Sequence, residues 1–258
     1  MNAELRTPED DSPGAINAGA DAGTDALDAR QMTIPLASDA SAKALIECGV
    51  DEVGIGSAIG EVYAAACILN PARRINGLRD SKQLLPARRL ELSDRIKERA
   101  LDYCIATASL EEVNEFNVMR ATMLAMQRAV AGLRIRPDLV LIDGNRMPQL
   151  PMAARTIIKG DAKVRAISAA SILAKVARDA AMLVYHERFP QYGIAENKGY
   201  LTEFHLAALR LHGPSPIHRK HYAPVRALLD AEEIEELNLG LLPTQTQVTP
   251  GNQPSPGK

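Results

Sequence analysis

The chain has 258 residues, of which 46% are hydrophobic and 24% charged, a composition typical of a soluble globular protein. No apolar run reaches the roughly 18 residues of a membrane span, and the polar, acidic start is unlike a signal peptide. The three cysteines (Cys48, Cys67 and Cys104) lie far apart with no CxxC pair, which argues against a disulfide framework or a zinc site. These features predict a cytoplasmic protein.

Charge and composition divide the chain into three parts. The net charge is −2, but the acids are concentrated at the two ends, and the centre is basic. A basic centre favours a polyanionic partner, although an ordinary solvated surface explains the charge equally well. Residues 1–40 and 233–258 lack hydrophobic periodicity and are predicted to be a disordered arm and tail. We therefore expect one folded domain over 41–232.

The first half of this domain begins with strands. The pattern predicts a strand over 44–53, a glycine-rich turn over 54–60 and an antiparallel partner strand over 61–69. After a loop, Pro86 is well placed to begin a helix. The expected elements that follow are a helix over 86–103, a strand over 104–108, and two helices over 110–116 and 117–132.

The second half alternates strands and helices. A short, fully apolar strand over 139–142 is expected at the centre of the sheet, and another strand is expected over 155–159. The longest helical pattern covers 164–187, and a last helix covers 200–211 as a small C-terminal extension. This order predicts an α/β fold with a mixed sheet flanked by helices.

Four acids occupy similar places in the predicted fold. Asp51 and Glu52 lie at the end of the first strand, Asp143 follows the apolar strand, and Asp161 opens the long helix. Taken singly, each is most simply a helix cap or a turn residue. Strand ends in such a sheet converge on one crevice, however, where four carboxylates would repel one another unless cations neutralised them. Oxygen ligands favour Mg²⁺ or Mn²⁺, and two such ions about 4 Å apart serve phosphodiester hydrolysis.

Other motifs are weaker on their own. The turn at Gly54-Ile55-Gly56 precedes a strand, so it is a poor dinucleotide fingerprint; it is either a hairpin connection or a place where backbone approaches a sugar or phosphate. Ser168 could touch phosphate or allow close helix packing. His218 and His221 have no third metal ligand nearby, and their basic stretch is more plausibly a phosphate contact.

Together the motifs resemble a known family. Over residues 48–226 the chain is similar to bacterial ribonuclease HII, with the motifs in the family's order. The matching segments are GVDEVG at 49–54, DSK at 80–82, LIDGN at 141–145, KGD at 159–161, ISAASILAK at 167–175, KGY at 198–200 and HGPSPIHR at 212–219.

The resemblance implies an RNase H-like fold and hydrolysis of the RNA strand of RNA–DNA hybrids. It also implies incision of duplex DNA 5′ to a single embedded ribonucleotide, leaving 3′-hydroxyl and 5′-phosphate ends. Separately, we expect the protein to be a monomer. The family's glycine turn reads the 2′-hydroxyl, the group that separates RNA from DNA, and its tyrosine stacks on the neighbouring deoxyribose. The residues implied for two Mn²⁺ or Mg²⁺ ions are Asp51, Glu52, Asp143 and Asp161, and those implied for substrate are Gly54, Ile55, Gly56, Lys82, Ser168 and Tyr200.

The chain departs from the family pattern beside the glycine turn. Ile55 stands where the family usually has Arg, and Glu61 stands where it tends to have Pro or a small residue. The two glycines remain, so we expect weaker recognition of single ribonucleotides rather than its loss. A nucleic-acid-binding protein with little catalysis is the alternative, supported only by this turn. A different RNase H-fold nuclease, such as a resolvase, would explain the acids but neither Lys198-Gly199-Tyr200 nor Asp80-Ser81-Lys82.

Overall fold

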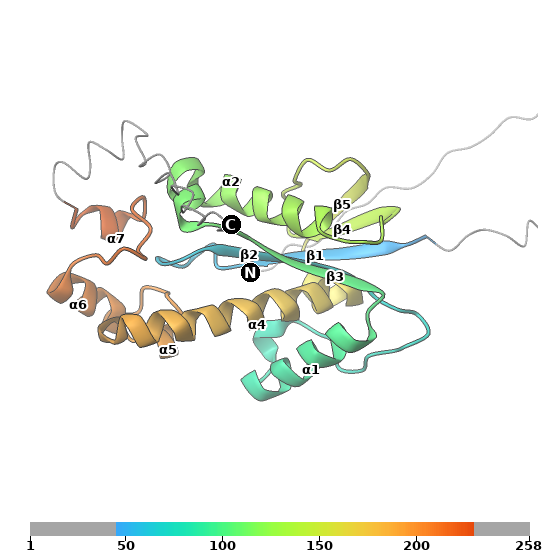
Figure 1. The fold of residues 1–258 in the computed structure, drawn as a ribbon, viewed down its shortest axis with the longest axis horizontal. Coiled ribbons are helices and arrows are strands. Elements are labelled where there is room, and N and C mark those ends of the chain that lie inside the picture. The colour runs from blue at the N-terminus through green and yellow to red at the C-terminus, as the bar shows by residue number, and fades with distance from the viewer. Residues whose placement is uncertain (1–44, 230–258) are drawn as a thin grey trace, which may run out of the picture. The chain divides into compact units, whose positions relative to one another are not determined.

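A computed structural model describes residues 45–229 (Figure 1). The predicted arm at 1–40 and tail at 233–258 lie outside the described residues. Within 45–229, no helix combines the length and the apolar character needed to cross a membrane.

The fold is built on a mixed sheet of five strands in the order β3-β2-β1-β4-β5. β1 is antiparallel to β2, and β2 to β3, whereas β1 is parallel to β4 and β4 to β5. This confirms the predicted mixed sheet with the apolar strand at its interior. The strands are β1 (Glu47–Val53), β2 (Val62–Ile68), β3 (Asp102–Ala108), β4 (Leu139–Asp143) and β5 (Ala153–Ile157).

Helices cover both faces of the sheet (Figure 1). α2 (Leu110–Ala131) packs on one face, and α1 (Pro86–Arg99) and α4 (Arg165–Arg188) pack on the other. Both cores are aliphatic, as the scarcity of aromatic residues predicts. α4 crosses β1 so closely that a Cβ on Gly49 would lie 2.1 Å from the backbone carbon of Ala166.

A third cluster lies at one end of the sheet and corresponds to the predicted C-terminal extension. Buried side chains there include Tyr192, Ile194, Leu209 and Val225, and they pack against Ile59 of the glycine-rich turn. The short elements around it are η2 (Pro190–Tyr192), α5 (Ile194–Asn197), α6 (Glu203–His212) and α7 (Ala223–Arg226). This cluster therefore attaches the C-terminal helices to the turn that follows β1.

Several element boundaries differ from those predicted. α1 ends at Arg99 rather than 103, because the buried Asp102 begins β3 and accepts hydrogen bonds from the backbone N–H groups of Arg134 and Ile135. β5 covers 153–157 rather than 155–159, because Lys159 adopts a left-handed conformation with φ 56° that ends the strand. A short helix, α3 (Gly160–Lys163), then precedes α4.

Two further helix limits have local causes. The predicted break between 116 and 117 is confirmed, because Asn117 interrupts α2 with φ 68° while its side-chain oxygen accepts hydrogen bonds from Met119 and Arg120. The last long helix begins at Glu203 rather than 200, because the Thr202 side chain caps it. Tyr200 therefore lies in a loop.

Candidate active site

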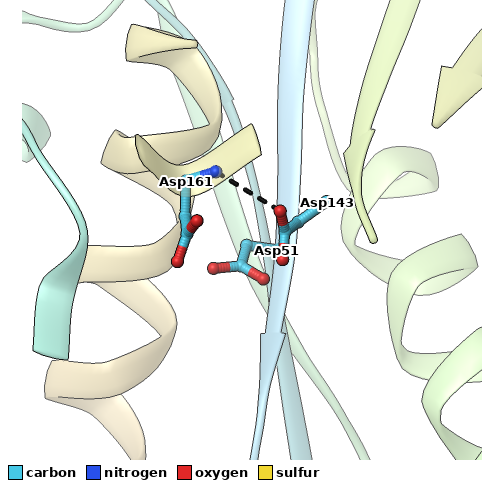
Figure 2. Close-up of side chains that lie close together, drawn as sticks. All are labelled: Asp51, Asp143 and Asp161. Carbon is cyan, nitrogen blue, oxygen red and sulfur yellow. Dashed lines mark hydrogen bonds between the residues drawn. The ribbon is translucent and has the colours of Figure 1, made fainter. Parts of the chain in front are cut away.

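Three carboxylates from separate elements meet at one edge of the sheet. Asp51 lies on β1, Asp143 is the last residue of β4, and Asp161 lies in α3 just after β5. Each offers a carboxylate oxygen within 4.8 Å of the others (Figure 2). They meet because β1, β4 and β5 are parallel neighbours, whose carboxyl ends share an edge.

Hydrogen bonds hold these carboxylates in place. Asp143 Oδ1 accepts from the backbone N–H of Gly160 at 2.6 Å and from that of Asp161 at 3.3 Å, the bond drawn in Figure 2. Asp51 Oδ1 accepts from the backbone N–H of Glu52 at 2.8 Å. The Ser168 hydroxyl donates to the Asp161 carbonyl at 2.6 Å. The site is therefore organised by the protein itself.

The Asp80-Ser81-Lys82 segment completes one wall. η1 (Ser81–Gln83) is capped by Asp80, and the Ser81 and Ser171 hydroxyls lie 2.9 Å apart. Ser171 in turn acts on Asp51 and partly offsets the rise in its pKa. Lys82 is exposed, and its positive charge acts on both Glu52 and Asp161. This places a free ammonium group beside the carboxylates.

Glu52 lies outside the group of three but adjoins it. Successive side chains of a strand point to opposite faces, so Glu52 faces α2 while Asp51 faces α4. Glu52 lines a small cavity together with Ile55, Asp143, Met119 and Met123. The predicted fourth acid is thus close to Asp143, on the same side as the glycine turn.

The electrostatics of the site favour a bound cation. Burial, followed by repulsion from Glu52, raises the pKa of Asp51 well above its usual range. Burial and the Asp143 charge raise the pKa of Glu52 to about 7 and also raise the pKa of Asp161. No ion pair among residues 45–229 neutralises Asp51, Asp143 or Asp161. An all-oxygen set of this kind fits Mg²⁺ or Mn²⁺.

The glycine turn and Tyr200 form a second part of the site. Gly54 has φ +101°, and a Cβ on Gly56 would lie 3.4 Å from the Tyr200 ring. The two segments are joined by a hydrogen bond from the Ala58 N–H to the Gly199 carbonyl at 2.9 Å. Tyr200 is 40% exposed. The ring therefore stands beside the turn with a face available to a ligand.

Arg219 holds this turn in place through hydrogen bonds to its carbonyls, a role that sequence reasoning missed. Its guanidinium donates to the carbonyls of Ile55, Ser57, Gly60 and Glu61 at 2.7 to 3.0 Å, and the residue is 1% exposed. The prediction that the basic stretch at 218–221 contacts phosphate is therefore wrong for Arg219. The only sequence signal was its place in the HGPSPIHR motif.

Two buried histidines support Tyr200. The Ser215 N–H donates to Nδ1 of His218, so His218 carries its proton on Nε2 and donates it to Nε2 of His205 at 3.2 Å. His205 then carries its proton on Nδ1 and donates it to the Tyr200 carbonyl at 3.0 Å. This single consistent assignment requires both rings to be neutral.

Two of the residues singled out in the sequence make contacts within the protein. Ser168 is 3% exposed and its hydroxyl donates to the Asp161 carbonyl at 2.6 Å, so it holds the main chain at Asp161. A contact of Ser168 with phosphate stays a prediction. Glu61, the other departure from the family pattern, is bound to α4: its Oε1 accepts a hydrogen bond from the Tyr185 hydroxyl at 2.6 Å, and its Oε2 is buried.

Comparison with known proteins identifies the family. Residues 48–225 match the family model described as Ribonuclease HII. The chain belongs to the ribonuclease HII family. Ribonuclease HII of Desulforamulus reducens is 56% identical over 76% of this chain and 98% of its own length. Ribonuclease HII 1 of Methylibium petroleiphilum is 59% identical over 71% of this chain and 93% of its own length.

A solved structure agrees with this assignment. The ribonuclease H2 from Pyrococcus horikoshii is similar with a TM-score of 0.60 and 25% identity, covering 70% of this chain and 96% of that one. The fold predicted from the resemblance is thereby confirmed. As a member of the ribonuclease HII family, the chain is a ribonuclease H, an endonuclease that acts on RNA–DNA hybrids.

Proposed function

We propose that the chain is a divalent-metal-dependent endoribonuclease that also incises duplex DNA 5′ to an embedded ribonucleotide, leaving 3′-hydroxyl and 5′-phosphate ends. The observation that carries this is the meeting of Asp51, Asp143 and Asp161 within 4.8 Å at the sheet edge. Glu52, Ile55 and Asp143 line one cavity, so the carboxylates adjoin the turn that would meet the ribose.

Asp51, Glu52, Asp143 and Asp161 would hold two ions, Mn²⁺ or Mg²⁺. Such ions supply an activated water nucleophile and stabilise the leaving oxygen of a phosphodiester. The protein orients the Asp143 carboxylate in advance through a backbone N–H group of α3, and Ser168 fixes the main chain at Asp161 by donating to its carbonyl. Preorganised ligands of this kind avoid the cost of rearrangement during the reaction.

The neighbouring residues would bind the nucleic acid. Lys82 is exposed beside the carboxylates and would contact a phosphate. The backbone at Gly54, Ile55 and Gly56 would approach the 2′-hydroxyl, and Tyr200 would stack on the adjacent deoxyribose. A backbone that reads this hydroxyl separates RNA from DNA without a base-specific contact.

Cleavage of two labelled duplexes tests this proposal. One carries a single ribonucleotide in DNA and the other is a uniform RNA–DNA hybrid, each with Mg²⁺, with Mn²⁺ and after chelation. We expect both to be cut only with a metal, and the first 5′ to the ribonucleotide. Binding of both duplexes without cleavage under any metal would instead support the alternative, a nucleic-acid-binding protein with little catalysis.

Ile55→Arg should selectively improve cutting at single ribonucleotides. A cation beside a phosphate contributes on the order of 1–3 kcal/mol, and Ile55 supplies none. We expect single-ribonucleotide cleavage to rise about tenfold, since ~1.4 kcal/mol corresponds to a factor of ten. Hybrid cleavage should change less, because a continuous RNA strand offers many registers. The measurement is the ratio of the two kcat/KM values at one fixed salt concentration.

Leu211→Arg is the matched control for this change. Leu211 is 78% exposed on α6, so the variant adds the same charge away from the turn. In Leu211→Arg the ratio of the two kcat/KM values should stay at the original value, because added charge strengthens binding to both duplexes alike. An unchanged ratio in Ile55→Arg would show that this turn does not set selectivity for the junction.

We also propose that the enzyme acts as a monomer in the cytoplasm. The proposed reducing compartment rests on the sequence, in which Cys48, Cys67 and Cys104 lie far apart with no CxxC pair. Size-exclusion chromatography with light scattering would test the oligomeric state.

A further inference from the structure

Arg178 of α4 is a buried cation without an ion-pair partner among residues 45–229. It is 0% exposed, and its Nε and Nη1 atoms are buried without a hydrogen-bond partner. Of the nearby acids, Asp179 accepts from Lys175 and Arg89. Glu61 accepts from Tyr185 through Oε1, and its Oε2 is buried without a hydrogen-bond partner. Burying an unpaired charge is unfavourable.

Arg178 contacts both the glycine turn and the segment that carries Tyr200. Its carbon Cζ lies 5.7 Å from the centre of the Tyr200 ring, a cation–π distance. Nη2 donates to the Lys198 carbonyl at 3.0 Å, in the left-handed bend that precedes Tyr200. A Cβ on Gly54 would lie 2.5 Å from Nε, so the turn rests directly on the guanidinium.

We propose that Arg178 is a positioning residue for recognition of the ribonucleotide junction. It holds the Tyr200 ring and the turn at Gly54 in one fixed relation, in which both meet the substrate. Being 0% exposed, it acts through these residues and not by touching nucleic acid. This inference rests on the proposed function, because it assumes that Tyr200 stacks on the sugar beside the ribonucleotide.

The first test compares Arg178→Met and Arg178→Lys on a duplex with one ribonucleotide. We expect Arg178→Met to raise KM about tenfold while kcat stays within about threefold, because the metal site is untouched. Arg178→Lys should stay within about threefold of the original KM, since it keeps a cation over the ring. Arg178→Gln is a second uncharged variant, which keeps a donor for the Lys198 carbonyl. It should raise KM as much as Arg178→Met does.

Thermal unfolding separates positioning from a purely structural role. A buried charge without an ion-pair partner is unfavourable, so replacing it by an apolar side chain of similar length removes a cost to folding. The melting temperature of Arg178→Met should therefore equal or exceed that of the original enzyme. A lower melting temperature, with the apparent kcat reduced in proportion to the unfolded fraction and KM unchanged, would overturn the proposal.

A double-mutant cycle with Tyr200→Ala tests whether Arg178 acts through the tyrosine. Tyr200→Ala alone should raise KM, and adding Arg178→Met should then raise it by clearly less than the tenfold seen in the original enzyme, since only the effect through the turn remains. If Tyr200→Ala leaves KM unchanged, the proposed role of Tyr200 fails. If Tyr200→Ala raises KM and Arg178→Met multiplies that rise by its full tenfold, the role of Arg178 fails while that of Tyr200 stands.

The chain has no Trp, so Tyr200→Trp introduces a single fluorescent reporter at the site. Arg178 should hold this ring against the turn and limit its access to acrylamide. We expect Arg178→Met in the Tyr200→Trp background to increase quenching, whereas Arg178→Lys should leave it unchanged. Equal quenching in all three proteins would contradict a positioning role.

Discussion

Asp143→Asn should lower the cleavage rate at least about 10³-fold, and Asp51→Asn should do the same. Each change removes a charge from the cluster that would hold the divalent ions, and with it the stabilisation of the transition state. The fold should remain, because an Asn Oδ1 can still accept the backbone hydrogen bonds that Asp51 and Asp143 accept. The measurement is single-turnover cleavage of a hybrid at saturating Mg²⁺ and at saturating Mn²⁺.

Stability measurements complete this test. The carboxylates repel one another, so the metal-free Asn variants should unfold at or above the temperature of the original enzyme. Mg²⁺ should raise the melting temperature of the original enzyme more than that of either variant. Asp94→Asn, an exposed acid on α1, is the control and should retain full activity. Near-normal cleavage by Asp51→Asn or Asp143→Asn would contradict the assignment.

The carboxylate cluster could be predicted because its cause is local in the sequence. Each acid lies at or just beyond the carboxyl end of a strand, and parallel neighbours bring such positions to one edge. The pattern also explains the difference between Asp51 and Glu52, since adjacent strand residues face opposite sides. The feature that could not be predicted from the sequence was the register between neighbouring strands, which depends on pairing between distant segments.

The supports of the turn could not be predicted, because they depend on contacts across more than a hundred residues. Arg219 binds carbonyls at 55–61, and Arg178 lies under Gly54. In the sequence, an Arg in a helix or beside other basic residues is usually a surface residue. Burial of these two cations follows from the packing of the C-terminal helices against the turn, which no local pattern encodes.

The histidine pair should make the fold sensitive to acid. Burial, together with repulsion from His205, lowers the pKa of His218 from 6.5 to about 4, and burial also lowers the pKa of His205. Between pH 6.5 and about 4, His218 binds a proton in the unfolded chain but not in the folded chain. The stability that the neutral His218 contributes is therefore fully present above pH 6.5 and is lost as the pH falls towards about 4.

The free energy of unfolding, compared between the original enzyme and His218→Gln, measures this contribution. The active-site carboxylates have raised pKa values and so act in the opposite direction, favouring the folded state at lower pH. Both proteins contain them, so their effect cancels in the difference. We expect the stability advantage of the original enzyme to shrink by up to about 1.4 kcal/mol per pH unit below 6.5. A difference that is independent of pH would mean that His218 can be protonated without breaking its hydrogen bonds to Ser215 and His205, and the neutral pair would no longer account for how Tyr200 is held.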